Sequence, residues 1–149
     1  MFRKFAVALT ASLLAATAAA AAVAPNTPTP MPQVKAKMKS VVDKTYTALF
    51  TTASEADPEN GADQKLPNAA GWTKVKAQAD ALKVVADWMQ DPKVGKTAEA
   101  NWMKDAKAMS ELSATASKAA TAKDAKALAQ AANDLSDNCA SCHKVYKKQ

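Results

Sequence analysis

The 149-residue chain has a single histidine and only two cysteines, so it holds few of the side chains that bind transition metals. These three residues, Cys139, Cys142 and His143, lie together near the C-terminus. A structural zinc site takes about four nitrogen or sulfur ligands, and the sequence has no further Cys or His to complete one. The shortage of ligands therefore argues against a zinc protein.

Aromatic residues are also scarce, at 5% of the chain, and much of the 48% hydrophobic content is alanine. Small side chains fill little volume, whereas protein interiors are densely packed. We therefore expect a thin core, in which a large flat group could fill the remaining volume. No alternating apolar pattern predicts a β-strand, and no internal repeat is visible. The length and composition predict one all-α domain.

Residues 1–24 have the order of a secretory signal peptide: a basic start with Arg3 and Lys4, an apolar Ala-rich run, and the small residues Ala22-Val23-Ala24. The alternative is an uncleaved membrane anchor, but alanine drives insertion into lipid only weakly. We predict export to the periplasm of a Gram-negative-type cell, cleavage of the signal, and no stable membrane insertion afterwards. Residues 25–31, rich in proline, are expected to form a flexible tether.

The formal net charge is +6, and loss of Arg3 and Lys4 with the signal peptide would lower it by two. Many lysines lie beside acidic residues on helical patterns, which is typical of a mixed, solvated surface. The pattern indicates some bias toward acidic partners and no nucleic-acid footprint.

Four helical patterns follow within residues 32–149, which we expect to form one folded domain. The first, about 32–54, is followed by a long loop at 55–71, the second spans 72–90, the third begins near Thr97, and the fourth follows a predicted capping box, Thr121-Ala122-Lys123-Asp124. Together they predict an all-α, four-helix up-down-up-down bundle. The inward faces predicted for the four helices are Val34, Met38, Val41, Val42, Thr45 and Leu49; Trp72, Val75, Ala79, Leu82, Ala86 and Met89; Trp102, Ala106, Met109, Leu112 and Ala116; and Leu128, Ala132, Leu135, Cys139, Cys142 and Tyr146.

The run Cys139-Ala140-Ser141-Cys142-His143 matches the C-x-x-C-H pattern of c-type haem attachment. On a helix, Cys139 and His143 are one turn apart with Cys142 beside both, so two thioethers and an iron ligand come from one short segment. The alternatives are a thioredoxin-like dithiol, which belongs at a helix start after a strand, and a disulfide, which leaves His143 unexplained. The pattern, together with the export signal, favours one covalent haem c per chain.

With this motif at the end of four helices, the chain resembles the class II c-type cytochromes, the cytochrome c′ family. The specific part of the resemblance is Cys139 to Lys147, and the order of the helices extends it over the mature chain. The resemblance implies a haem between the first and fourth helices, with the motif at the C-terminal end of the fourth. In low-spin members a methionine of the first helix binds the iron opposite the histidine, and Met38 occupies the corresponding stripe.

The sequence leaves two alternatives for the side of the iron opposite His143. Met38 is either an axial ligand or a core side chain, and in the second case Val34, Val41 and Val42 would form an apolar lid over five-coordinate iron that binds NO or CO. The arginine that the family often carries before its distal residue is absent here, because that turn reads Val34-Lys35-Ala36-Lys37.

We predict a periplasmic single-electron carrier with Cys139 and Cys142 holding haem covalently, His143 as axial ligand and Met38 as candidate second ligand. No enzyme activity and no catalytic residue is expected, since a peroxidase-like reaction needs a further acid–base side chain and no second histidine exists. Redox proteins are the expected partners, and a homodimer is compatible with the Ala-rich surface. Trp72, Trp88 and Trp102 are more typical of core packing than of haem contact, and Lys144, Lys147 and Lys148 are candidate contacts of a propionate or a docking partner.

Overall fold

A computed structural model of the chain describes residues 31–96 and 99–147. The predicted signal peptide, most of the predicted tether, Thr97 and Lys148 therefore lie outside the described residues. Within them the chain is helical and contains no strand element, as the sequence predicts. No helix of this described part is both long enough and apolar enough to cross a lipid bilayer.

The first long helix consists of three consecutive segments with different hydrogen-bond patterns. An α-helix, α1 (Met31–Lys37), continues as a π-helical segment, η1 (Met38–Val42), and then as α2 (Asp43–Ala56). Pro32 lies in the first turn of α1, where its missing N–H is not needed. The π-helix is rare in proteins, and short π segments inside α-helices are frequently found at functional sites.

The loop predicted at 55–71 is partly structured, and the next helix starts earlier than expected. A 3₁₀ segment, η2 (Pro58–Asp63), is capped by Asp57, whose side chain accepts a hydrogen bond from the Glu59 N–H. Helix α3 (Ala69–Met89) begins after Asn68, whose Oδ1 accepts from the Gly71 N–H at 2.8 Å. This Asn cap supplies one missing acceptor at the N-terminus and allows the helix to start three residues before Trp72.

Helix α4 (Ala100–Ala122) and helix α5 (Ala125–Tyr146) are joined by a tight turn, and here the predicted capping box is wrong. Thr121 is still inside α4, and its hydroxyl donates to the Ser117 carbonyl. Lys123 adopts the left-handed conformation, with φ of 56°, and ends α4. Asp124 is the true cap of α5, because its carboxylate accepts from the Ala127 N–H at 2.9 Å.

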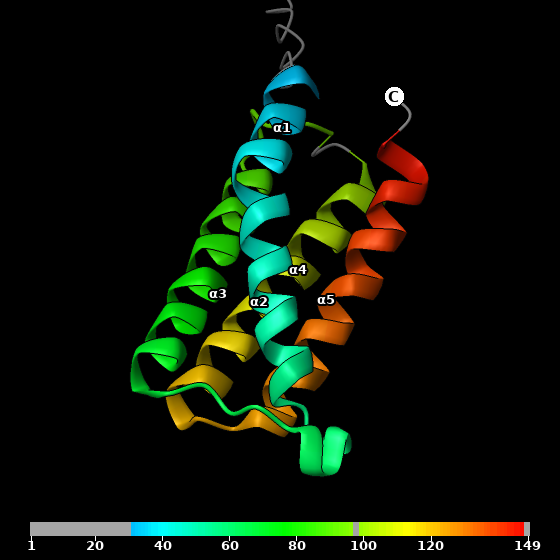
Figure 1. The fold of residues 1–149 in the computed structure, drawn as a ribbon. Coiled ribbons are helices and arrows are strands. Elements are labelled where there is room, and N and C mark those ends of the chain that lie inside the picture. The colour runs from blue at the N-terminus through cyan, green and yellow to red at the C-terminus, as the bar shows by residue number, and fades with distance from the viewer. Residues whose placement is uncertain (1–30, 97–98, 148–149) are drawn as a thin grey trace, which may run out of the picture.

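The long helices lie side by side, and the chain direction alternates from each to the next (Figure 1). Helix α4 packs against both α3 and α5, and α2 packs against both α3 and α5. The N-terminus of α1 and the C-terminus of α5 lie at the same end of the molecule, opposite η2 (Figure 1).

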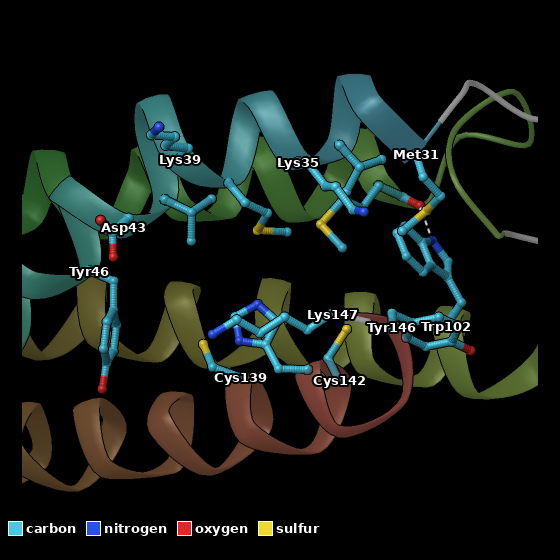
Figure 2. A pocket seen from close by; sticks show the side chains of 15 residues that line it. Met31, Lys35, Lys39, Asp43, Tyr46, Trp102, Cys139, Cys142, Tyr146 and Lys147 are labelled. Atoms are coloured by element: carbon cyan, nitrogen blue, oxygen red, sulfur yellow. Dashed lines mark hydrogen bonds between the residues drawn. The ribbon is translucent and has the colours of Figure 1, made fainter. Parts of the chain in front are cut away.

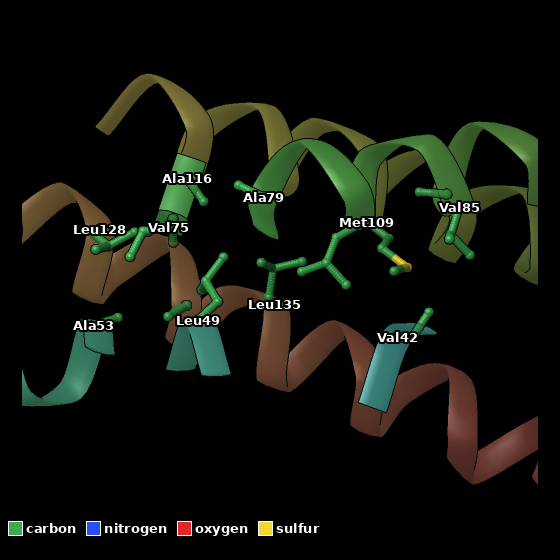
Figure 3. Packing of buried hydrophobic residues seen from close by; sticks show 14 of the residues in the cluster. Val42, Leu49, Ala53, Val75, Ala79, Val85, Met109, Ala116, Leu128 and Leu135 are labelled. Carbon is green, nitrogen blue, oxygen red and sulfur yellow. The ribbon is translucent and has the colours of Figure 1, made fainter. Parts of the chain in front are cut away.

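The core is built from one stripe of each helix, and alanines make up much of it (Figure 3). Leu49, Leu82, Leu128 and Leu135 are its largest aliphatic side chains and are at most 1% exposed. All six residues predicted for the inner face of α3 are buried, which confirms the predicted inner face of this helix. Alanines are small and allow helices to pack closely. The end of the molecule where α1 begins and α5 ends contains a cavity.

Candidate haem-binding cavity

A cavity of about 630 Å³ lies between the first long helix and α5 (Figure 2). Its walls come from α1, η1 and the start of α2 on one side, from the last two turns of α5 on the other, and from Met89 and Trp102 behind. The lining residues are Met31, Val34, Lys35, Met38, Lys39, Val42, Asp43, Tyr46, Met89, Trp102, Cys139, Cys142, His143, Tyr146 and Lys147.

Both cysteines of the C-x-x-C-H motif point from α5 into this cavity (Figure 2). They are free thiols and half-buried. Burial raises the pKa of the Cys139 thiol, and it raises the pKa of Cys142 to about 11, with smaller contributions from the negative charges of Asp105 and Cys139. A reactive dithiol of the thioredoxin kind has a lowered thiol pKa, so these cysteines lack the electrostatic setting of a redox dithiol.

His143 follows Cys142 and lines the same cavity, although its side chain is exposed to solvent. It lies one turn after Cys139, so α5 brings the imidazole and both thiols to one wall. Within the described residues, neither ring nitrogen of His143 has a hydrogen-bond partner, so both are available to a bound group.

The opposite wall is formed by residues of the first helix spaced four apart: Val34, Met38, Val42 and Tyr46. An α-helix turns about 100° per residue, so three four-residue steps would drift by about 120° and carry Tyr46 away from the cavity. The wider turn of η1, which includes Met38 and Val42, absorbs much of this drift. The π segment thus keeps Met38 and Tyr46 on the same wall.

Aromatic side chains close the two ends of the cavity, as Figure 2 shows. Tyr46 stands at the Cys139 end, where burial raises the pKa of its hydroxyl and a hydrogen bond with Ser136 of α5 opposes that rise. Trp102 and Tyr146 close the Cys142 end and contact each other edge to face, with ring centroids 5.2 Å apart. The Trp102 indole N–H donates to the Met89 carbonyl at 2.9 Å, which fixes the ring.

Three lysines, Lys35 and Lys39 from the first helix and Lys147 after α5, lie where the cavity meets solvent, and Asp43 is the carboxylate among the lining residues. All three lysine side chains are exposed. The cavity is therefore apolar within and basic at its edge.

Cys139, Cys142, His143 and Met38 line one cavity together with Val34 and Val42, two of the three valines considered for an apolar lid. Val41, the third of these valines, does not line the cavity, and Tyr46 lines it where Thr45 was expected on the inner face, because the π segment shifts the helical register. Trp72 lies in the core away from the cavity, and Trp88 is half-buried beneath the ammonium group of Lys37, so of the three tryptophans only Trp102 is a lining residue.

Several lining residues were not predicted for the site, among them Met31, Lys39, Asp43, Tyr46 and Met89. Met31 was expected in the tether but is the first residue of α1. Tyr46 continues the four-residue spacing of Val34, Met38 and Val42, a signal that was visible in the sequence. Met89 ends the inner stripe of α3, and only the packing of α3 behind the cavity reveals its second role.

Within the described residues, no three His, Cys, Asp or Glu side chains form a group that could hold a metal ion by themselves. A comparison of the chain with protein-family models, with curated proteins and with solved structures finds no match.

Proposed function

We propose that this chain is an exported mono-haem c-type cytochrome that carries single electrons. Cys139 and Cys142 would hold haem c covalently, His143 would bind the iron on one side, and Met38 would bind it on the other. One observation carries the proposal: the residues of the C-x-x-C-H motif and Met38, about a hundred positions apart in the sequence, line the same cavity.

The cavity suits a large flat cofactor in size and in chemistry. Its volume of about 630 Å³ falls within the roughly 300–1,000 Å³ typical of cofactor and ligand pockets. Two free thiols point into it, and its interior is lined mainly by aliphatic, thioether and aromatic side chains. A bound macrocycle would supply the bulk that an Ala-rich, aromatic-poor core lacks.

The residues have distinct roles in this proposal. Cys139 and Cys142 would hold the haem through two thioether bonds. When bound, the haem supplies the one-electron couple between ferric and ferrous iron. His143 would give an imidazole nitrogen to the iron, and Val34 and Val42, both buried, would exclude water around Met38.

The same proposal gives the helices their arrangement. We propose that α1 to α2 as one unit, together with α3, α4 and α5, forms a four-helix up-down-up-down bundle with the haem between its first and last members. The alternating chain direction and the packing of α2 and α4 against α3 and α5 support it.

A second candidate is a five-coordinate protein that binds NO or CO. It is favoured by the position of Met38 between Val34 and Val42 in an apolar wall, where a thioether can pack without reaching iron. The two candidates differ only in whether the Met38 sulfur binds the metal.

An absorption spectrum of the full chain, purified from an export-competent host that matures c-type cytochromes, tests both. We expect haem bands that remain with the polypeptide after denaturation, and sharp low-spin bands that carbon monoxide does not change. Broad high-spin bands that shift with carbon monoxide would establish the five-coordinate alternative. A Cys139→Ser, Cys142→Ser double variant serves as the control for covalent attachment, and a wild-type protein without haem bands would refute the proposal.

A further inference from the structure

The two tyrosines of the chain, Tyr46 and Tyr146, line the same cavity but have different hydroxyl partners. The Tyr146 hydroxyl donates to Glu99 Oε2 at 3.0 Å. The hydroxyl partner of Tyr46 is Ser136, and Asp137 acts on Tyr46 only through its charge. An ionised carboxylate takes up a proton readily, whereas a serine hydroxyl does not. Of the two tyrosines, therefore, only Tyr146 has a good proton acceptor at its hydroxyl.

The Tyr146 ring is buried and in contact with a second aromatic ring of the cavity wall (Figure 2). Tyr146 and Trp102 are 3% and 1% exposed, and their rings meet edge to face with centroids 5.2 Å apart. Both rings line the cavity, so a haem bound there would be adjacent to both. Single electrons pass most readily between π systems that lie close together. An electron can thus move from Tyr146 to the cavity, either directly or through Trp102.

The hydrogen-bond partner of Trp102 is a poor proton acceptor. The indole N–H donates to the Met89 carbonyl at 2.9 Å, and an amide carbonyl is a very weak base. Oxidised Trp102 would keep its proton and place a positive charge in a buried site, which is unfavourable. Oxidation of Tyr146 instead releases a proton to Glu99 and leaves a neutral ring. Burial therefore favours Tyr146 over Trp102 as the residue on which an oxidation ends.

Glu99 connects the Tyr146 hydroxyl to solvent. The Glu99 side chain is 45% exposed, and its Oε1 lies 3.4 Å from the Lys96 ammonium nitrogen. An exposed carboxylate exchanges protons with water, so a proton received from Tyr146 can leave the protein. The proton path from Tyr146 thus leads to solvent, while the electron path leads into the cavity.

We propose that Tyr146 is a redox-active residue that gives up one electron and one proton when hydrogen peroxide is reduced at the proposed haem, with Trp102 as relay and Glu99 as proton acceptor. The inference rests on the proposed function, because the peroxide would be reduced at the iron. Hydrogen peroxide takes up two electrons and two protons and gives two molecules of water. In the reduced protein, one electron comes from ferrous iron, which becomes ferric, and the other comes from Tyr146. The Tyr146 proton passes to Glu99, the two protons for water come from solvent, and a neutral tyrosyl radical remains.

This oxidation would protect the cavity from damage. Met31, Met38 and Met89 line it, and thioethers are readily oxidised to sulfoxides. When Tyr146 supplies the second electron, none of these methionines has to supply it. One electron from the donor that reduces the carrier, together with the proton held by Glu99, then restores the Tyr146 phenol.

Electron paramagnetic resonance of the reduced haem protein, frozen after mixing with hydrogen peroxide, is the first test. Each protein is also prepared with Met38→Ala, so that peroxide reaches the iron in either candidate function. We expect a tyrosyl radical signal that Tyr146→Phe abolishes and that Tyr46→Phe, the matched control, retains. Glu99→Gln still accepts the hydrogen bond but cannot take the proton, so it should lower the signal severalfold.

Three results of this test would overturn the proposal. They are the absence of a tyrosyl signal from protein that shows haem bands, a signal that Tyr46→Phe removes and Tyr146→Phe keeps, and a signal that Glu99→Gln leaves unchanged. Circular dichroism checks that each variant is folded, because Tyr146→Phe loses a hydrogen bond. Should Tyr146→Phe fail to fold, Glu99→Gln decides the case, since it retains both rings.

The second test needs no haem and so separates this proposal from the proposed function. Tris(bipyridine)ruthenium(III), a one-electron oxidant generated by a light flash, is applied to the full chain and to the same variants. Tyr46 is more exposed than Tyr146, so access alone predicts a radical on Tyr46. We expect the radical on Tyr146, because Glu99 accepts its proton. A radical on Tyr46 would refute the role of Tyr146, whereas a protein without haem bands would contradict only the proposed function.

Discussion

The Tyr146 hydroxyl, on the last turn of α5, donates a hydrogen bond of 3.0 Å to Oε2 of Glu99, the residue before α4. The Tyr146 ring contacts Trp102 and lines the cavity, while its hydroxyl reaches the start of α4. This contact ties the turn that carries His143 to the neighbouring helix. It joins residues 47 positions apart and closes one end of the proposed haem site.

Tyr146→Phe should destabilise the fold by about 1 kcal/mol, the usual net contribution of one hydrogen bond, while the ring still fills its place. Burial, followed by the hydrogen bond to Glu99, raises the pKa of Tyr146 from 10.0 to about 12. A raised folded-state pKa means that the stabilisation is complete below pH 10 and is lost as the pH rises toward 12. Urea denaturation between pH 7 and 11.5 measures this loss. If the wild type and the variant lose stability equally over that range, Tyr146 is not the titrating group.

Gly95→Ala should destabilise the protein more than Gly61→Ala. Both glycines have φ of 55°, so both substitutions place an alanine at a positive φ, which strains the backbone by at least about 1 kcal/mol. A Cβ at Gly95 would also lie 2.7 Å from Trp102 Cη2, whereas a Cβ at Gly61 meets nothing within 4 Å. Gly61→Ala therefore reports backbone strain without a clash, and a lower urea midpoint for Gly95→Ala indicates the added clash with Trp102. Equal midpoints would mean that the segment before α4 yields freely around Trp102.

Two aspartates seven residues apart on α3 set its register against α4. Asp80 accepts from Ser117 at 2.6 Å and Asp87 accepts from Ser110 at 2.5 Å, and each also pairs with the lysine one turn before it. Since α3 and α4 run in opposite directions, the lower-numbered aspartate meets the higher-numbered serine.

The hydrogen bonds and charges of Lys76 and Ser117 lower the pKa of Asp80, and those of Lys83 and Ser110 lower the pKa of Asp87. Lowered values mean that the stabilisation is present above the ordinary pKa of 3.8 and is lost as the pH falls below it. The double variant Asp80→Asn, Asp87→Asn should lose about 1 kcal/mol at pH 7, because both pairs are exposed, and very little at pH 2.5. Thermal melts at both pH values check this. Asp63→Asn on η2 is the control. If the double variant were destabilised equally at pH 7 and at pH 2.5, Asp80 and Asp87 would not be the groups responsible.

Met38→Ala should convert the haem-loaded protein from a six-coordinate low-spin spectrum to a high-spin one and lower its reduction potential, because a thioether ligand favours ferrous iron. Met31→Ala and Met89→Ala remove other thioethers from the same cavity and serve as matched controls. Absorption spectra and redox titrations of the three variants separate ligation from packing. A low-spin spectrum that survives only in Met38→Ala and not in Met31→Ala would transfer the ligand role to Met31.

Local patterns in the sequence were sufficient to predict the helices. The stripe from Trp72 to Met89 is buried throughout, because a long amphipathic run has one stable way to hide its apolar face. The end of α4 was harder to predict, because Thr121 and Asp124 both carry side-chain oxygens that can cap a helix. Only the backbone conformation of Lys123 decides between them. Helix boundaries depend on such small differences in hydrogen bonding, and the loop expected at 55–71 was predicted too long for the same reason.

The sequence by itself determined the all-helical fold and the grouping of Cys139, Cys142 and His143, because residues within one helical turn are neighbours in any context. Only the tertiary structure decided that Met38 lies across the cavity from them and that Tyr46 rather than Thr45 shares its wall. These juxtapositions depend on how the first helix packs against α5 and on the register shift at η1. The packing between distant segments depends on many small contacts together, and no local sequence pattern reveals which of them form.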